Sequence, residues 1–327
     1  MALKQIRWGI IGCGNVTETK SGPAFQQIEG SEIVAVMRRD ADKAADYAKR
    51  HGIAKWYANA DDLINDTEVN AIYIATPPDS HAEYTLKALK AGKPVYVEKP
   101  MALNYAEAKK MISASRKYQV PVFVAYYRRA LSGFLKAKEW IDKHAIGEIT
   151  NINLHLCLPA RKEDYKAKNL PWRVQKEIAG GGYFFDLASH QLDWLSFVFG
   201  KADFVSSHVE NRCGLYAAED YVEANLRYRK KIDFRGKWDF CAKKEKATDS
   251  IEIIGRLGKI TFSTFAFEAL VLENKKGKKE FPFDKPKHVQ KQLIEQVVKQ
   301  LQGIDTCVST VLSATETNRL MEKIIYG

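Results

Sequence analysis

Lys93-Pro94-Val95-Tyr96-Val97-Glu98-Lys99-Pro100 is the stretch that decides how the first half of this chain folds. Its apolar, β-branched centre predicts a short buried strand. Pro100 lacks a backbone N–H and favours an extended residue before it, so the strand must end with Glu98 and Lys99 at its carboxyl end. In an open parallel α/β sheet, that end is where ligands bind. An isolated Glu-Lys-Pro is more simply interpreted as a surface salt bridge in a βα turn, but the sequence on either side reverses this preference.

The overall composition indicates a globular protein of two domains, because 327 residues can bury a substantial core. The formal net charge of +11 suits an anionic cofactor or substrate. The two dense basic runs, 243–246 and 275–279, carry no recognition-helix or zinc-finger pattern, and the second has the glycine of a hairpin tip. No apolar run is long enough to span a bilayer, and the first residues do not form a signal peptide. We therefore expect a cytoplasmic protein with neither nucleic acid nor membrane as a partner.

The cysteines are few and scattered. They are odd in number and form no C-x-x-C pair, which predicts reduced thiols in a cytoplasmic protein. The five positions are Cys13, Cys157, Cys213, Cys241 and Cys307.

A glycine loop, Gly12-Cys13-Gly14-Asn15-Val16-Thr17, follows directly on an apolar strand, Ile6–Ile11. Gly12 permits a tight turn, and Gly14 lets the backbone approach a pyrophosphate at a helix N-terminus. Thr17 stands where a third glycine is common, which predicts slightly looser packing of the helix on the strand. Such a loop alone is a weak signal, but here it has the expected place after the first strand. The residues predicted to bind the dinucleotide here are Gly12, Gly14, Asn15 and Val16.

The second strand, 32–37, ends in Arg38-Arg39-Asp40. Sites for NAD usually carry an acid here that binds the ribose 2′-hydroxyl. A guanidinium can instead bind a 2′-phosphate through its planar fork and stack on adenine. Arg38 and Arg39 therefore predict NADP(H) as the preferred cofactor, with NAD(H) possible. The alternative is that both arginines are solvated and Asp40 binds the ribose.

The strand Ala71–Ala75 ends in Thr76-Pro77-Pro78, whose prolines stop the strand and form a rim over the dinucleotide. His81 begins a helix that runs to about residue 91, and we expect it to have a structural role on the cofactor side. Strand and helix alternate from the glycine loop to residue 125, which predicts a doubly wound parallel sheet. The cofactor-binding residues predicted at its edge are Thr76, Pro77, Pro78, His81, Glu98 and Lys99.

A triple glycine, 180–182, precedes a strongly apolar helix, 183–199. Three glycines cannot pack a core, so they serve backbone approach or flexibility. Asp186 and His190 are four residues apart and would share one face of the helix near its start. They could be an exposed pair that caps the helix, but the flanking sequence favours a polar cluster that faces the cofactor. No third ligand has a spacing that would make them a metal site.

Short strands joined by turns follow from residue 203 to 274, and two amphipathic helices, 287–302 and 311–326, close the chain. The prediction is an α/β protein with an NAD(P)-binding domain at 1–125. A substrate-binding and oligomerisation domain follows at 126–327, of α+β type with a large, mainly antiparallel open sheet. The last helix could pack back on the first domain. An antiparallel sheet can leave one face free for a partner.

These motifs together resemble the glucose-fructose oxidoreductase/inositol dehydrogenase/rhizopine-catabolism (Gfo/Idh/MocA) family in order and spacing, over nearly the whole chain. The segments concerned are Gly12-x-Gly14, Thr76-Pro77-Pro78 with His81, Glu98-Lys99-Pro100, Arg128-Arg129, and 180–190 with Asp186 and His190. The resemblance implies a Rossmann domain and NAD(P)-dependent oxidation or reduction at CH–OH groups of sugars, inositols and related compounds. It also implies a cis bond before Pro100, and a homodimer or homotetramer formed through the second sheet.

The resemblance further implies that the junction at 126–129 borders the nicotinamide and the substrate. Arg128 would hold a substrate oxygen or the cofactor amide, and a salt bridge at the domain junction is an equal alternative. We expect His190 to be the acid/base, oriented by Asp186, while Lys99 stabilises charge on the reacting oxygen; the roles of Lys99 and His190 could be exchanged. The residues predicted to contact the substrate are Lys99, Tyr126, Arg161, Trp172, Arg173, Asp186 and His190.

The predicted reaction is hydride transfer between nicotinamide and a hydroxyl or carbonyl carbon of a sugar, inositol or related polyol. An enzyme of dihydrodiol dehydrogenase or anhydrofructose reductase type is one alternative. A non-catalytic regulator that senses NADP is another, but the presence of Lys99, Asp186 and His190 favours an enzyme. Specificity would lie in loops such as 157–175, whose sequence has no readable code.

Overall fold

The computed structural model describes residues 2–327, which form two compact units. The first unit comprises the chain up to Tyr127 together with Pro286–Thr315, and the second comprises Arg128–Lys285 together with Glu316–Gly327. The division at Tyr127 lies two residues beyond the boundary expected from the sequence. The segment Pro286–Thr315, which the sequence analysis assigned to the second domain, belongs instead to the first unit.

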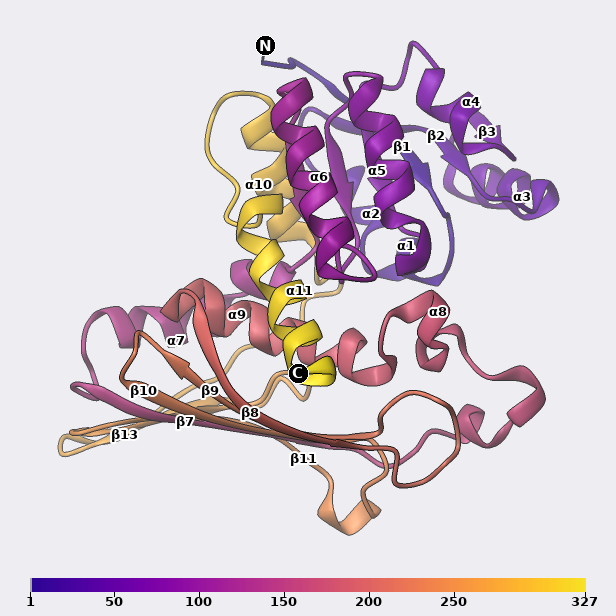
Figure 1. Ribbon diagram of the computed structural model, residues 1–327. Helices are drawn as coiled ribbons and strands as arrows, with labels where there is room; N and C mark the ends of the chain where they lie inside the picture. The colour runs from indigo at the N-terminus through magenta and orange to yellow at the C-terminus, as the bar shows by residue number, and fades with distance from the viewer. Residues whose placement is uncertain (1) are drawn as a thin grey trace. The chain divides into compact units, whose positions relative to one another are not determined.

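The first unit contains the expected doubly wound sheet. Six parallel strands lie in the order β3-β2-β1-β4-β5-β6 (Figure 1). They are β1 (Ile6–Ile11), β2 (Ser31–Met37), β3 (Lys55–Tyr57), β4 (Ala71–Ile74), β5 (Val95–Val97) and β6 (Val122–Val124). Ile74 pairs with both Ile11 and Val97, so β1, β4 and β5 end level with one another. The strand order reverses between β1 and β4, which is where this kind of sheet binds its ligand.

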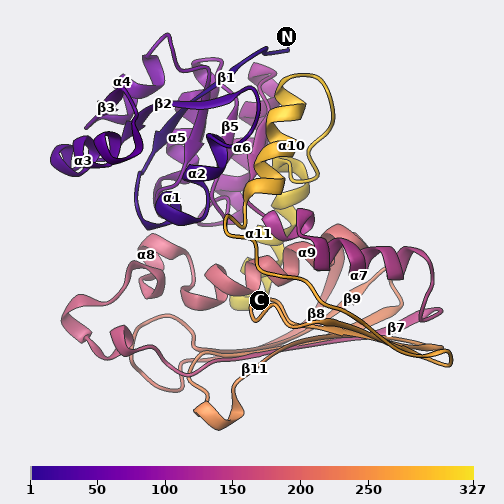
Figure 2. The same cartoon turned by 180° about the vertical axis from the view of Figure 1, so that it is seen from behind.

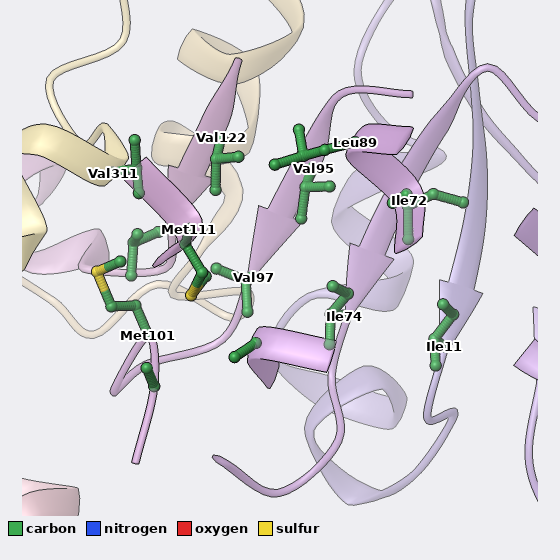
Figure 3. Close-up of a cluster of buried hydrophobic side chains, with 14 of the residues drawn as sticks. Ile11, Ile72, Ile74, Leu89, Val95, Val97, Met101, Met111, Val122 and Val311 are labelled. Atoms are coloured by element: carbon green, nitrogen blue, oxygen red, sulfur yellow. The ribbon is translucent and has the colours of Figure 1, made fainter. Parts of the chain in front are cut away.

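Helices cover both faces of this sheet. α5 (His81–Lys90) and α6 (Tyr105–Tyr118) lie on the face toward the viewer in Figure 1. α2 (Gly22–Phe25) and α10 (Lys291–Leu301) lie on the other face, seen in Figure 2. The remaining helices that precede residue 66 are α1 (Asn15–Thr19), α3 (Ala41–His51) and α4 (Ala60–Asn65). Figure 3 shows the core that this arrangement buries, with side chains from β1, β4, β5, β6, α5 and α6 in one cluster.

The second unit contains an eight-stranded sheet in the order β14-β13-β12-β11-β7-β10-β9-β8. Neighbouring strands are antiparallel except for β7 and β10, which are parallel, so the predicted mainly antiparallel sheet is confirmed. The strands are β7 (Ile149–Cys157), β8 (Ala202–Glu210), β9 (Tyr221–Tyr228), β10 (Ile232–Asp239), β11 (Thr248–Gly255), β12 (Gly258–Phe262), β13 (Leu270–Asn274) and β14 (Gly277–Phe281). The sequence analysis missed β14, because its lysines were assigned to the tip of a hairpin.

Two longer helices, α7 (Ser132–Asp142) and α9 (Ser189–Phe199), lie along one face of this sheet. The strands alternate accordingly: Leu154 and Trp238 are fully buried, whereas His155 is exposed. The short helix α8 (Lys176–Ala179) precedes the triple glycine, and a π-helical turn, Phe184–Ala188, leads directly into α9. The closing helix α11 (Val311–Tyr326) contributes its first residues to the first unit and the rest to the second.

One prediction about the cysteines is wrong. Cys213 and Cys241 form a disulfide, with Cα atoms 6.4 Å apart. The pairing of Tyr221 with Asp239 at the ends of β9 and β10 brings the loop before β9 beside the residues that follow β10. This juxtaposition depends on strand register, which the spacing of the cysteines does not reveal. Cys13, Cys157 and Cys307 are free and buried.

Every helix within residues 2–327 is too short or too polar to cross a lipid bilayer.

Candidate active site

The glycine loop has the geometry that a dinucleotide requires. Gly12 follows β1 with a φ of +93°, and a Cβ at this position would lie 2.7 Å from Cγ2 of Thr76. Only glycine fits there. Gly14 precedes α1, and a Cβ on it would meet nothing closer than 3.9 Å, so its backbone is open to a bound group. Asn15 and Val16 form the first turn of α1. These four residues fit the pyrophosphate of a dinucleotide cofactor.

Thr17 closes the same loop instead of a third glycine. Its side chain is fully buried, and its hydroxyl donates to the carbonyl oxygen of Gly14 at 2.8 Å. The neighbouring Cys13 is also buried, and burial raises the pKa of its thiol to about 11. Cys13 is therefore a protonated packing residue rather than a nucleophile.

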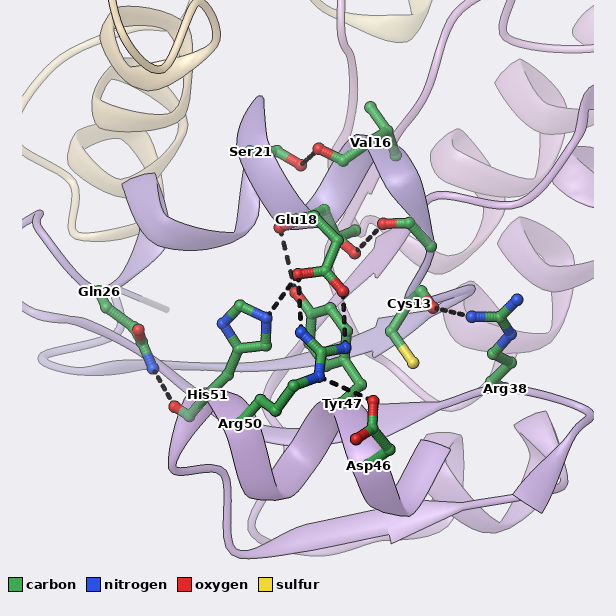
Figure 4. A network of polar contacts seen from close by, with 12 residues as sticks. Cys13, Val16, Glu18, Ser21, Gln26, Arg38, Asp46, Tyr47, Arg50 and His51 are labelled. Carbon is green, nitrogen blue, oxygen red and sulfur yellow. Dashed lines mark hydrogen bonds and ion pairs between the residues drawn. The ribbon is translucent and has the colours of Figure 1, made fainter. Parts of the chain in front are cut away.

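The arginine at the end of β2 contacts this loop. Nη1 of Arg38 donates to the carbonyl oxygen of Cys13 at 3.3 Å (Figure 4). Arg39 is exposed. Asp40 is the N-cap of α3: its carboxylate accepts the backbone N–H of Lys43 at 3.1 Å and the Lys43 ammonium at 2.6 Å. The bond to Lys43 lowers the pKa of Asp40. Because Asp40 serves the helix, Arg38 is the better candidate for the group beside the adenosine ribose.

A polar network fixes α1 against α3, and the sequence analysis missed it. Glu18 accepts from Arg50 at 2.8 Å and lies 2.9 Å from Nε2 of His51 (Figure 4). The Arg50 guanidinium lowers the pKa of Glu18. The Tyr47 hydroxyl donates to the carbonyl oxygen of Thr17 at 3.1 Å. The helix that carries the glycine loop is thus held by three side chains of α3, a pairing that no local pattern encodes.

His81 joins the turn after β4 to the turn after β5. Its ring is fully buried, with Nε2 2.8 Å from the carbonyl oxygen of Thr76 and Nδ1 2.9 Å from that of Pro100. Burial lowers the pKa of His81, so the neutral ring donates to one of the two carbonyls at a time. Pro77 and Pro78 lie between these contacts, at the start of a short 3₁₀ turn. This is the structural role that the sequence analysis preferred for His81.

The carboxylate of Glu98 points into the core, although the sequence analysis assigned it to the cofactor. Its Oε1 accepts from the Tyr73 hydroxyl at 2.7 Å and from Nε2 of Gln290 at 2.6 Å. Oε1 of Gln290 in turn accepts from the Tyr96 hydroxyl at 2.9 Å. The other oxygen of Glu98 lies 3.3 Å from the backbone nitrogen of Lys99. Burial raises the pKa of both tyrosines, so both remain donors.

Lys99 is half-buried and precedes a cis peptide bond to Pro100. Tyr126, just after β6, is fully buried. Gly12, Thr76 and Lys99 follow β1, β4 and β5, which are adjacent parallel strands. The structure therefore brings the three predicted motifs of the first unit to one edge of the sheet.

In the second unit, Arg128 and His190 meet on an aromatic ring that the sequence analysis missed. The Arg128 guanidinium lies 4.4 Å from the centre of the Phe265 ring, and its Nε donates to the carbonyl oxygen of Thr264 at 3.1 Å. The ring of His190, which is buried on α9, contacts the same phenylalanine edge-on at 6.0 Å between centres. A single aromatic residue between strands carries no sequence signal that would have found Phe265.

Asp186 lies in the π-helical turn that precedes α9. Its carboxylate is 3.2 Å from Nε of Arg173, whose guanidinium stacks on Trp172 at 4.4 Å. Arg161 belongs to a separate group, with its guanidinium 4.3 Å from the Tyr183 ring centre. The prediction that Asp186 and His190 share a helix face assumed α-helical spacing, which a π turn changes.

The triple glycine is used for close approach to the protein itself. A Cβ on Gly181 would lie 2.3 Å from the Phe185 ring, and Gly182 has a φ of +61°. Packing against the π turn therefore accounts for Gly181, and a positive φ with close packing against Ala218 accounts for Gly182.

Comparison with known proteins agrees with this description. Residues 6–126 match the model of the Gfo/Idh/MocA oxidoreductase family with its NAD-binding Rossmann fold, and residues 134–261 match the family's C-terminal domain. The chain is 39% identical to oxidoreductase P35 of Formosa agariphila over 97% of this chain and 98% of that one. It is 27% identical to 1,5-anhydro-D-fructose reductase of Ensifer adhaerens, covering 85% of this chain and 83% of that enzyme.

Among solved structures, the 3-ketoreductase KijD10 of Actinomadura kijaniata, crystallised with NADP and TDP-benzene, superposes with a TM-score of 0.83. The alignment covers 98% of this chain and 97% of that one at 20% identity, which supports the fold alone. The two family models and the 39% identical relative together cover nearly the whole chain. It follows that the chain belongs to the Gfo/Idh/MocA family and is an NAD(P)-binding oxidoreductase.

Proposed function

We propose that this protein is an NADP(H)-dependent oxidoreductase that transfers hydride between the nicotinamide and a hydroxyl or carbonyl carbon of a sugar, inositol or related polyol. The observation that carries the proposal is the edge formed by β1, β4 and β5, where the glycine loop, the Thr76 turn and Lys99 follow adjacent strands. Gly12, Gly14, Thr76 and Lys99 are the residues that would hold a dinucleotide on that edge.

The cofactor supplies or accepts the hydride, and the protein must position the substrate and move a proton. In this proposal the Lys99 ammonium donates a hydrogen bond to the reacting oxygen and stabilises negative charge on it. The imidazole of His190 takes the hydroxyl proton during oxidation and returns it during reduction. Asp186, with Arg173 and Trp172, binds the distal part of the substrate. Arg128 holds a polar group of the substrate or of the nicotinamide amide.

A screen of sugars, inositols and ketosugars, followed by the absorbance of NADPH, tests the proposal. Lys99→Ala and His190→Ala should each lower kcat on the identified substrate by about 100-fold or more. Lys90→Ala on α5 and His144→Asn in the turn after α7 are controls, because both side chains are exposed and lie outside the eight-stranded sheet, and both variants should turn over normally. Near-normal turnover in both active-site variants would refute the assignment of roles. Absence of turnover with every compound, together with a stoichiometric protein partner in a pull-down, would favour an NADP-sensing regulator instead.

Reduction of 1,5-anhydro-D-fructose is a second candidate, favoured by the 27% identity to the Ensifer adhaerens enzyme over most of both chains. Inclusion of this compound in the screen separates the two: turnover of anhydrofructose with a kcat/KM well above that for every sugar would select it.

We further propose that the protein is a homodimer or homotetramer formed through the eight-stranded sheet. Among residues 2–327, α7 and α9 cover one face of this sheet, and no long helix covers the other (Figure 1). Light scattering coupled to gel filtration should give two or four times the chain mass, and a monomer would refute this.

A further inference from the structure

We propose that Asp249 is a positioning residue for the active site and that Phe265 is the surface against which Arg128 and His190 are held. This inference rests on the proposed function for its catalytic consequence. All four residues belong to the second unit. Neither Asp249 nor Phe265 belongs to the motifs of the family resemblance described above.

The carboxylate of Asp249, on β11, holds the loop that follows β12. Oδ1 accepts the backbone N–H of Thr264 at 2.9 Å, and Oδ2 accepts those of Phe265 at 2.5 Å and Ala266 at 3.1 Å. Three consecutive amides thus converge on one carboxylate. We call the Asp249 carboxylate with the three amides of residues 264–266 the cradle. Hydrogen bonds to an ionised acceptor are roughly twice as strong as those between neutral groups, so the cradle fixes the loop backbone.

The loop in turn connects to two elements that carry active-site candidates. The carbonyl oxygen of Thr264 accepts Nε of Arg128 at 3.1 Å. Its hydroxyl oxygen accepts Nε2 of Gln191 at 2.9 Å, and Oε1 of Gln191 accepts Nε1 of Trp238 at 2.7 Å. Gln191 is adjacent to His190 on α9. Every polar atom of Thr264 therefore makes a hydrogen bond. The amide binds Asp249, the carbonyl oxygen binds Arg128, and the hydroxyl binds Gln191, the neighbour of His190.

The ring of Phe265 contacts the side chains of both Arg128 and His190. Its ring lies under the Arg128 guanidinium at 4.4 Å and meets the His190 ring at 6.0 Å with the planes inclined by 73°. A guanidinium over an aromatic face is attracted by the ring quadrupole, and this attraction holds the cation in one place. If the cradle opens, the ring shifts, and both polar groups lose their common support.

The first experiment measures the loop directly and does not depend on any substrate. Asp249→Asn leaves one carbonyl oxygen for three amides, so hydrogen exchange of residues 264–266, followed by mass spectrometry, should accelerate by about tenfold or more. Glu252→Gln is the matched control. Glu252 is an acid on the same strand as Asp249, but it pairs with Lys259 and not with the loop, so this variant should leave the exchange of residues 264–266 unaltered. Unchanged exchange at 264–266 in Asp249→Asn overturns the cradle.

The second experiment separates positioning from general stability. Asp249→Asn and Phe265→Leu should each lower kcat by about five- to tenfold with the substrate KM changed less than about threefold. Phe265→Tyr keeps the aromatic face and should retain about half or more of the wild-type kcat. Equal turnover in the Leu and Tyr variants overturns the role of the ring. If wild-type protein turns over no compound, the proposed function fails, while the exchange result still decides the cradle.

Discussion

The side chain of Gln290 connects two distant parts of the first unit, and its removal should lower the free energy of unfolding. Its side chain donates to Glu98 and accepts from Tyr96, and all three groups are buried. Gln290→Leu removes a hydrogen bond to a carboxylate, worth about 1.5–3 kcal/mol, and leaves the Tyr96 hydroxyl without its acceptor, at about 1–3 kcal/mol. The free energy of unfolding should therefore fall by about 3 kcal/mol or more.

Urea unfolding followed by circular dichroism measures this loss. Gln292→Leu is the matched control, because Gln292 is exposed in the first turn of α10, the helix for which Gln290 is the N-cap, and this variant should change the free energy of unfolding by less than about 0.5 kcal/mol. Adding Tyr96→Phe to Gln290→Leu removes the orphaned hydroxyl, so the double variant should recover about 1 kcal/mol. A loss below about 1 kcal/mol in Gln290→Leu, or no recovery in the double variant, would refute the stabilising role of the hydrogen bonds that Gln290 makes with Glu98 and Tyr96.

Three further predictions concern single side chains. Burial lowers the pKa of His81, so the unfolded chain protonates this ring at a higher pH than the folded protein does, and stability should fall as the pH drops below about 6.5. His81→Gln should flatten this part of the curve of unfolding free energy against pH, and an unchanged slope would contradict the prediction. Asp193→Ala removes the carboxylate that Nε of Arg129 contacts at 2.8 Å in a fully buried ion pair, and it should cost about 3–5 kcal/mol in urea unfolding; a loss below about 1 kcal/mol would be contrary. Arg38→Ala should raise the Kd for NADPH about tenfold and that for NADH by less than about threefold in fluorescence titrations; equal changes would mean that Arg38 does not contact the 2′-phosphate.

Local patterns predicted the elements of the first unit well, because each strand there is short, apolar and ended by a strong signal. Gly52 ends α3, and the two prolines after Thr76 end the strand before them. These signals act within a few residues, where sequence order and spatial order coincide. The turns that carry Gly12, Thr76 and Lys99 were therefore found from the sequence.

What the sequence did not reveal depends on contacts between distant positions. Gln290 is 192 residues from Glu98, and the two cysteines of the disulfide are brought together by strand register. Phe185 of the π-helical turn around Asp186 packs closely on Gly181, and an apolar run does not distinguish such a turn from an α-helix. Phe265 lies in a loop whose position is fixed by a carboxylate on another strand. Each of these features requires the folded chain.

The return of residues 286–315 to the first unit has a practical consequence for anyone who dissects this protein. A fragment that stops at Tyr127 lacks the glutamine that satisfies Glu98 and the Thr310 backbone that bridges to Phe123. Such a truncated half would expose the apolar flank that α10 covers and should aggregate. A stable nucleotide-binding module would need the returning segment spliced onto it through a short artificial linker, with the intervening 158 residues from Arg128 to Lys285 removed.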